Sequence, residues 1–175
     1  MPTANPFRLD PELVRFMTGG LSINTGSGSA EGLPSQCRAF GVRVDPTGRV
    51  TVFLAGAQAA DLLRDAARSR ALAVVFSDPP THRTIQLKGR DARVEPLRPG
   101  DLAEVRAYRE AFTRRLVPLG FTAPLVLALL DCPDDDLMAL TFTPEAAFDQ
   151  TPGAHAGAPL LPGALDGAPP DPAGP

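Results

Sequence analysis

An alternating stretch near the middle of the chain constrains the fold more than any other feature. Residues 71–94 read ALAVVFSDPPTHRTIQLKGRDARV, which is a short apolar run, a proline-containing turn and a second segment of alternating residues. Because side chains of a strand alternate between two faces, one face should carry three polar residues: Thr84, Gln86 and Lys88. Lys88 is the only lysine among 17 basic residues. Such a polar face is either exposed to solvent or lines a ligand site, and the strand alone permits both.

A β-hairpin is predicted just before this stretch. Residues 37–44 and 49–54 both alternate, and the tetrapeptide 45–48 (DPTG) joins them with a proline that presets φ and a glycine that tolerates positive φ. Apolar spacing predicts a helix over 57–68 and a strand buried on both faces over 72–76. Further strands are expected at 21–25 and 137–143, helices at 11–18, 101–116 and 125–130, a flexible loop at 26–32 and a final turn through 144–148.

This order of elements predicts a mainly β protein with flanking helices (α+β), built on a small antiparallel split β-barrel. A barrel of six short strands cannot enclose a large cavity, so a ligand would bind outside it, in a cleft shared with a second copy. We expect one domain over residues 11–151, after a flexible N-terminus of residues 1–10. Half of the residues from 152 to 175 are proline or glycine, which predicts a disordered tail over 152–175.

Composition argues against several functional classes. The net charge of −3 disfavours nucleic acid as a partner, since phosphates favour a strong basic excess. No apolar run approaches the roughly 18 residues that a membrane span needs. The N-terminal residues lack the basic and apolar regions of a secretory signal, so a cytoplasmic location is expected.

Metal and thiol chemistry find little support in the sequence. Cys37 and Cys132 show no metal-ligand spacing with His82 and His155, and two idle thiols are expected, although a disulfide stays open. Three adjacent acids, 134–136, are interpreted as a polar turn because neighbouring side chains point in different directions. With two histidines in the chain, a hydrolytic triad is not expected.

Several segments together resemble a known family. Residues 48–54 (GRVTVFL), the helix after them, residues 72–76 and residues 83–89 (RTIQLKG) resemble the pyridoxamine 5′-phosphate oxidase-like, FMN-binding split-barrel proteins. Residues 148–153 (FDQTPG) resemble the C-terminal end of some members. The resemblance covers about residues 10–150 and implies a homodimer with FMN in each of two clefts at the subunit interface.

The resemblance also implies cofactor-binding residues. Arg49, Val50 and Thr51 would lie beside the flavin on the strand after the hairpin. Gln58 would lie near the phosphate at the start of the following helix, where the helix dipole favours an anion. Arg83 and Thr84 of the later strand would approach the flavin from the partner subunit. Gln86 and Lys88 share the face of Thr84 by alternation. The complete set of expected cofactor-binding residues is Arg49, Val50, Thr51, Gln58, Arg83, Thr84, Gln86 and Lys88.

The chain departs from the family at two cationic positions. Leu54 stands where members with oxidase activity carry a lysine, and residues 56–58 (GAQ) replace a phosphate clamp resembling Ser-Arg-Lys. Each loss removes a charged hydrogen bond of roughly 1.5–3 kcal/mol. FMN binding is therefore expected to be weakened, and oxidation of vitamin B6 is not expected.

Two functions follow as expectations. The first is an FMN-dependent oxidoreductase of unknown substrate, in which the flavin carries the redox chemistry and no particular catalytic side chain is predicted. The second is a non-catalytic flavin- or haem-binding split-barrel protein. For haem, His82 is the candidate axial ligand, and the alternative for this residue is a solvated loop histidine.

Overall fold

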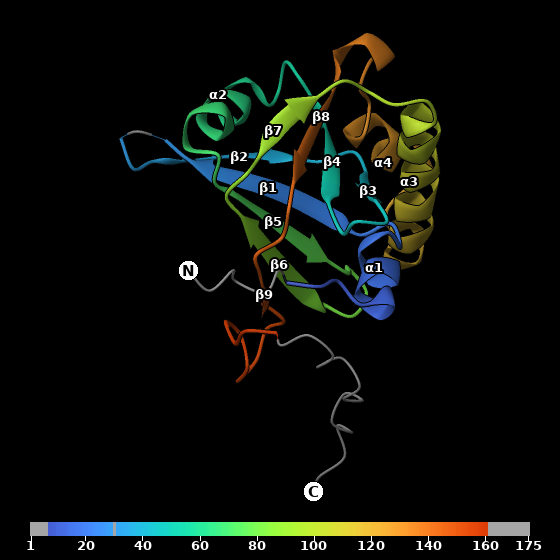
Figure 1. The fold of residues 1–175 in the computed structure, drawn as a ribbon. Coiled ribbons are helices and arrows are strands. Elements are labelled where there is room, and N and C mark those ends of the chain that lie inside the picture. The colour runs from blue at the N-terminus through green and yellow to red at the C-terminus, as the bar shows by residue number, and fades with distance from the viewer. Residues whose placement is uncertain (1–6, 30, 161–175) are drawn as a thin grey trace, which may run out of the picture.

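Two antiparallel sheets form a split barrel in the computed structural model, which describes residues 7–29 and 31–160 (Figure 1). Sheet A has five strands in the spatial order β2-β1-β5-β6-β9 and sheet B has four in the order β3-β4-β8-β7. The strands are β1 (Ser22–Gly28), β2 (Pro34–Arg38), β3 (Val42–Val44), β4 (Val50–Ala55), β5 (Leu72–Ser77), β6 (Thr84–Gly89), β7 (Arg93–Glu95), β8 (Leu137–Phe142) and β9 (Ala146–Asp149). The predicted fold class is confirmed.

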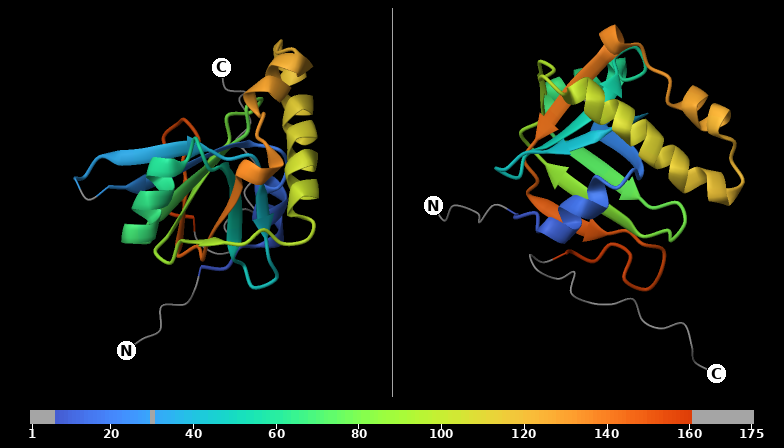
Figure 2. Two further views of the ribbon diagram at one scale, coloured as in Figure 1. Left: turned by 90° about the horizontal axis from the view of Figure 1, so that it is seen from above. Right: turned by 90° about the vertical axis from the view of Figure 1, so that its right-hand side faces the viewer.

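Four α-helices flank the sheets within the described residues, together with two 3-10 turns (Figures 1 and 2). They are α1 (Pro11–Met17), α2 (Ala60–Ser69), α3 (Asp101–Leu116) and α4 (Ala123–Leu129), with turns at Val117–Leu119 and Asp134–Asp136. The predicted start of α1 is confirmed, because Asp10 Oδ1 accepts a hydrogen bond from the Leu13 amide at 2.7 Å. The buried Tyr108 hydroxyl of α3 donates to the Leu21 carbonyl at 2.7 Å and ties the helix to the start of β1.

Four chain segments cross from one sheet to the other and make the two sheets one barrel. These segments join β2 to β3, β4 to β5 through α2, β6 to β7, and β8 to β9. The predicted strands over 37–44 and 83–94 are therefore each divided between sheets, because the chain bends at 39–41 and at 90–92. At one crossing Gly89 lies directly against the Thr143 carbonyl, where a Cβ atom has no room.

Three further sequence predictions differ from the structure. The glycine-rich segment predicted as a loop continues β1 to Gly28, which pairs with Pro34 of β2. Residues 146–149, predicted as part of a turn, form β9 on the edge of β6. β5 is buried on one face and half-buried on the other, because alternate residues point into the barrel and toward the outer face of sheet A.

The hydrogen-bonded part of the chain extends past residue 151, where the predicted tail began. The amides of Gly157 and Leu160 donate to the carbonyls of Asp149 (2.7 Å) and Ala147 (2.8 Å), so residues 152–160 return along β9. Residues 161–175 of the predicted tail and residues 1–6 of the predicted flexible N-terminus lie outside the described residues.

The core lies between the sheets and is rich in phenylalanine. Phe40, Phe76 and Phe142 are fully buried there. Ile85 and Leu87 of β6 join them at 2% and 0% exposure, while the intervening residues of β6 are half-buried or exposed. The alternation predicted for this strand is confirmed, and it leaves the polar face of β6 on the outside of the barrel.

Candidate functional site

The outer face of sheet A presents the predicted polar residues of β6 next to small, weakly polar side chains. Cross-strand pairing places Asn24, Val75, Gln86 and Phe148 in one row across β1, β5, β6 and β9. The next row has Lys88 beside alanines of β5 and β9 and a glycine of β1. Among these residues of β1, β5, β6 and β9, Lys88 is the charged one.

A groove with a volume of about 670 Å³ opens at the Lys88 end of this face. Its walls come from the β1–β2 hairpin, the start of β5, the end of β6 and β9. Gly26, Gly28 and Gly32 line it. For Gly28 and Gly32, no heavy atom of the described residues, chain neighbours aside, lies within 4 Å of the place where a Cβ would be. Glycine therefore leaves the backbone of the hairpin open to a flat ligand. The volume is in the usual range for a small-molecule site.

Two cations and one anion give the groove its charge. Lys88, Arg90 and Glu145 line it, so the side chains carry a net positive charge. The Lys88 Nζ atom lies over the Phe148 ring, 4.8 Å from its centre, which is a cation–π contact. An aromatic ring and a positive charge are thus paired at one wall. This arrangement suits a planar ligand with an anionic group.

The remaining predicted residues of β6 lie progressively farther from the groove. Gln86 accepts a hydrogen bond from Gln150 Nε2 at 3.3 Å. Thr84 shares a hydrogen bond with Ser77 at 2.8 Å. Arg83 lies at the opposite end of the strand, where its guanidinium stacks 4.5 Å over Phe16. Of the predicted cofactor-binding residues, Lys88 therefore lines the groove, and Gln86 lies next to it on the same face of β6.

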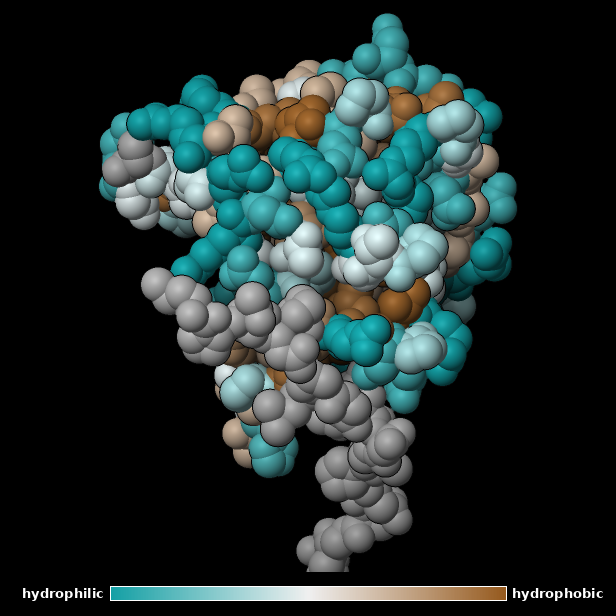
Figure 3. All heavy atoms as spheres, in the orientation of Figure 1, coloured by the Kyte–Doolittle hydropathy of each residue, from teal (hydrophilic) through white to brown (hydrophobic). Residues whose placement is uncertain are grey.

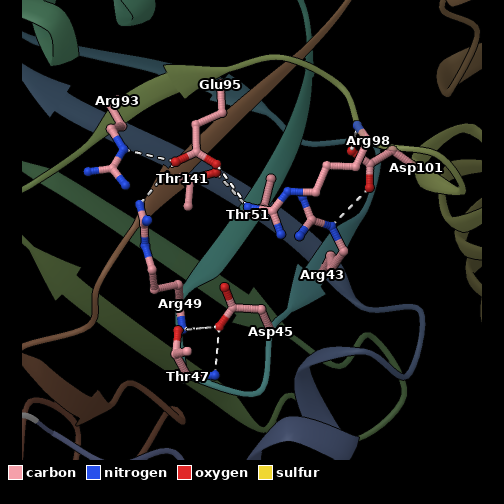
Figure 4. Close-up of polar contacts among 10 residues, drawn as sticks. All are labelled: Arg43, Asp45, Thr47, Arg49, Thr51, Arg93, Glu95, Arg98, Asp101 and Thr141. Carbon is pink, nitrogen blue, oxygen red and sulfur yellow. Dashed lines mark hydrogen bonds and ion pairs between the residues drawn. The ribbon is translucent and has the colours of Figure 1, made fainter.

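Thr51 lies on β4 of sheet B, and Arg49 directly precedes that strand (Figure 4). Neither residue lines the groove. Thr51 is 1% exposed and shares a 2.9 Å hydrogen bond with Thr141, and Val50 is fully buried in the core. Arg49 is held by an ion pair with Glu95 at 3.3 Å. The structure does not bring these three residues together with Lys88, and the two buried side chains do not reach a surface cleft.

Arg49, Arg93 and Arg98 surround Glu95 at β7 (Figure 4). This face of the molecule is mainly hydrophilic (Figure 3). Glu95 accepts hydrogen bonds from Arg93 Nε at 2.8 Å and from Arg98 at 3.1 Å, besides Arg49. The bond from Arg93, aided by the charges of Arg49 and Arg98, lowers the pKa of Glu95 despite its partial burial. The carboxylate therefore stays ionised and neutralises a local excess of positive charge.

The start of α2, where the resemblance places the FMN phosphate, does not fit a phosphate in this chain. The Ala57 amide donates to both carboxylate oxygens of Asp136, at 3.0 and 3.2 Å, and the Gly56 amide donates to the Asp136 carbonyl at 2.8 Å. The protein's own carboxylate thus takes the Ala57 amide just before α2 begins at Ala60, and its charge would repel an anion placed beside it. Gln58 is exposed beside it and makes no side-chain hydrogen bond among the described residues.

The described histidines and cysteines stand apart from the groove. His82 is exposed, with φ of 59°, in the turn between β5 and β6, at the end of β6 opposite Lys88. No histidine or cysteine of the described residues lines the groove. Cys37 and Cys132 are free and buried, and burial raises the pKa of both thiols. They therefore resist ionisation and reaction.

Across residues 7–29 and 31–160, no three histidine, cysteine, aspartate or glutamate side chains are grouped so as to hold a metal ion. None of the described helices combines the length and apolarity that crossing a membrane requires.

These features define the fold as an antiparallel split barrel of the pyridoxamine 5′-phosphate oxidase-like type, and solved structures agree. HupZ from Group A Streptococcus has a TM-score of 0.52 and 13% identity, over 85% of this chain and 100% of that chain. A candidate pyridoxamine 5′-phosphate oxidase from Lactobacillus delbrueckii has a TM-score of 0.51 and 16% identity, over 85% and 99%. A conserved hypothetical protein from Mycobacterium tuberculosis has a TM-score of 0.50 and 15% identity, over 85% and 88%. Neither a protein-family model nor a curated protein matches the sequence.

Several groove residues were not predicted from the sequence. Phe148 and Glu145 are separated from Lys88 by more than fifty residues and reach the groove through the pairing of β9 with β6. Arg90 directly follows the Lys-Gly that ends β6, and this cluster of two cations around a glycine was the available signal. Gly26 and Gly28 fall in the segment predicted as a loop, although their spacing of two fits a strand whose one face must stay open.

Proposed function

We propose that this protein binds a flavin, FMN, in the groove at the end of sheet A. The observation that carries the proposal is the pairing of Lys88 with the Phe148 ring above a glycine-lined hairpin, in a groove of about 670 Å³. The type of fold, which the resemblance associates with flavin, supports it. The contacts of Asp136 argue against a phosphate at the start of α2, so the groove is the better place for the ligand.

The groove residues divide between the two ends of such a ligand. Lys88 and Arg90 would hold the phosphate, because each brings a positive charge to the groove. The open backbone at Gly28 and Gly32 would accept the ring system. Gln86, beside Lys88 on the same face, offers an amide for the polar edge of the ring. We also propose that a second copy covers the weakly polar outer face of sheet A and closes the groove.

We propose an FMN-dependent oxidoreductase as the activity, with the substrate unassigned. When bound, the flavin supplies the hydride and electron chemistry, and the chain supplies binding and orientation. The alternative is a non-catalytic flavin carrier. One observation favours it: the titratable side chains that line the groove are Lys88, Arg90 and Glu145, without a histidine or cysteine among the described residues. Haem is not proposed, because no described histidine lies at the groove.

A binding titration tests the proposal. Purified protein is titrated with FMN and with riboflavin, and the quenching of flavin fluorescence is measured. We expect FMN to bind more tightly than riboflavin, because only FMN offers a phosphate to the cations. Lys88→Ala and Arg90→Ala should each weaken FMN by about tenfold, as expected for loss of a charged hydrogen bond, and should leave riboflavin unchanged.

The matched control is Arg64→Ala, which removes an exposed cation of α2 that pairs with Asp61. Its FMN affinity should equal that of the unchanged protein. If the protein quenches neither flavin, or if Lys88→Ala and Arg64→Ala behave alike, the groove is not the flavin site. Anaerobic addition of reduced nicotinamide cofactor then separates the two activities: bleaching of the bound flavin supports the oxidoreductase, and an unbleached flavin supports the carrier.

A further inference from the structure

Exposed apolar side chains gather around α4. Of the nine large apolar side chains that are exposed in the described residues, six lie between residues 117 and 129, each 46–58% exposed. We call these six the α4 surface: Val117, Leu119, Phe121, Leu125, Leu127 and Leu129. Monomeric soluble proteins rarely expose large apolar patches. When such a patch is present, it usually marks an interaction site.

The helix itself has the composition of a buried element. Its sequence, APLVLAL, is apolar on every side, and such helices normally lie inside a protein. Here Val126 is the buried residue of α4, while Leu125 and Leu129, one turn apart, face outward together. Figure 2 shows α4 alongside α3 at the outer edge of the molecule rather than between the sheets. The rest of the described chain buries Val126 and leaves the three leucines of α4 exposed.

Charge is distributed unequally at the two ends of this surface. Residues 116–130 contain no charged side chain. Arg114 precedes them with its side chain 72% exposed. Asp131 follows them and is also exposed, with Asp135 close behind. Along the chain, the uncharged α4 surface therefore follows an exposed basic residue and precedes exposed acidic ones.

We propose that the α4 surface binds a second copy of this chain, with the two surfaces antiparallel about a twofold axis. Twofold pairing requires a surface that is complementary to itself. An antiparallel arrangement meets this requirement, because it covers the apolar centre and places Arg114 of each copy against Asp131 of the other. No residue of the α4 surface lines the groove, so this contact is separate from the flavin site.

Two other occupants fit less well. An anionic lipid surface would be repelled by the exposed carboxylates of Asp131 and Asp135, which follow the α4 surface, whereas Asp134 is paired with Arg106 at 2.8 Å. Residues 161–175 of the chain contain two large apolar residues, Leu161 and Leu165, which is too few to cover six.

Assembly mass tests the proposal. Sedimentation velocity is measured over a range of concentrations for the full chain and for the double variant Leu125→Lys, Leu129→Lys. Because both side chains are exposed, the variant should keep the circular dichroism spectrum and thermal midpoint of the unchanged protein. We expect the mass of its assembly to be half that of the unchanged protein. Leu97→Lys, an exposed leucine elsewhere, is the control and should retain the full mass.

A charge exchange tests the antiparallel orientation. Arg114→Asp and Asp131→Arg should each raise the concentration needed for association by about tenfold, and the two together should restore it. A protein that stays monomeric at every concentration overturns the proposal, as does an unchanged mass for the leucine variant. Binding to phosphatidylcholine vesicles that the leucine variant abolishes, without any effect on mass, would instead assign the surface to lipid and also overturn it. The FMN titration measures flavin binding and not assembly mass, so the failure of this proposal and the failure of the flavin proposal can be told apart.

Discussion

Glu95 shows how one residue can hold a surface together. Its carboxylate accepts hydrogen bonds from Arg93, Arg49 and Arg98, and its side chain is 17% exposed. Arg49 has a buried Nε atom with no hydrogen-bond partner among the described residues, so the charge of Glu95 is the main compensation for its partial burial. Removing that charge would leave three guanidinium groups crowded together without an anion.

We predict that Glu95→Gln destabilises the protein at neutral pH by about 1–3 kcal/mol, the usual cost of losing hydrogen bonds to a charged group. Urea unfolding measures the change. Glu110→Gln is the control. The Glu110 side chain is 75% exposed and lies 3.9 Å from Arg114, so this ion pair should contribute little to the free energy of unfolding. Equal stability of the two variants would show that the arginines are solvated and need no partner.

The same carboxylate predicts a pH dependence. The pKa of Glu95 is lowered on folding, chiefly by the bond from Arg93, so the unfolded chain binds its proton more readily. Its contribution is therefore complete above the unfolded pKa of about 4.3 and is lost as pH falls through the lower folded value. The stability difference between the unchanged protein and Glu95→Gln should shrink as the pH is lowered through this window. A difference that is constant with pH would contradict the ion-pair account.

At the scale of elements, the crossing segments decide the architecture. The alternation of residues 83–89 predicted β6 and its two faces, and both are present. The chain leaves sheet A after Gly89 and enters sheet B at Arg93, and the sequence marks this place only by two adjacent polar residues, Arg90 and Asp91, which interrupt the alternation. The bend depends on how closely β6 approaches β8, which is a long-range contact.

Gly89→Ala tests this close approach. A Cβ at this position would overlap the Thr143 carbonyl and lie 2.7 Å from a ring carbon of Phe142. We predict a loss of about 1–3 kcal/mol, typical of overpacking in a rigid core. Gly28→Ala is the matched control, because its Cβ would meet no atom within 4 Å, and the substitution should be neutral or slightly stabilising. Thermal or urea unfolding compares the two, and similar midpoints would contradict the crossing geometry.

At the scale of the whole molecule, the C-terminal segment closes the edge of sheet A. Residues 152–160 return along β9 through backbone hydrogen bonds, although their proline and glycine content predicted disorder. Composition indicates how much apolar surface a segment can bury, but it gives no information about backbone hydrogen bonds to an exposed strand edge. The C-terminal end of the hydrogen-bonded part of the chain therefore depends on the neighbouring strand β9 rather than on the composition of the segment.

A pair of truncations tests this boundary. The chain ending at Gly153 loses hydrogen bonds from the amides of Gly157 and Leu160 to β9, and the chain ending at Leu160 keeps them. We predict that the shorter chain is less stable than the longer one by about 1–3 kcal/mol, since each backbone bond contributes about 0.5–1.5 kcal/mol. Urea unfolding of the two chains measures the difference. Equal stability would show that β9 needs no cover.

The sequence by itself determined the class of fold and the two faces of β6, because both follow from local alternation and from short turns such as Asp45–Gly48. It also placed Lys88 on an outward face. Only the tertiary structure decided where the site lies. Pairing with β9 brings Phe148 under Lys88, the contacts of Asp136 close the start of α2 to a phosphate, and burial removes Val50 and Thr51 from any cleft. These contacts join residues that are far apart in the chain, so no local pattern encodes them.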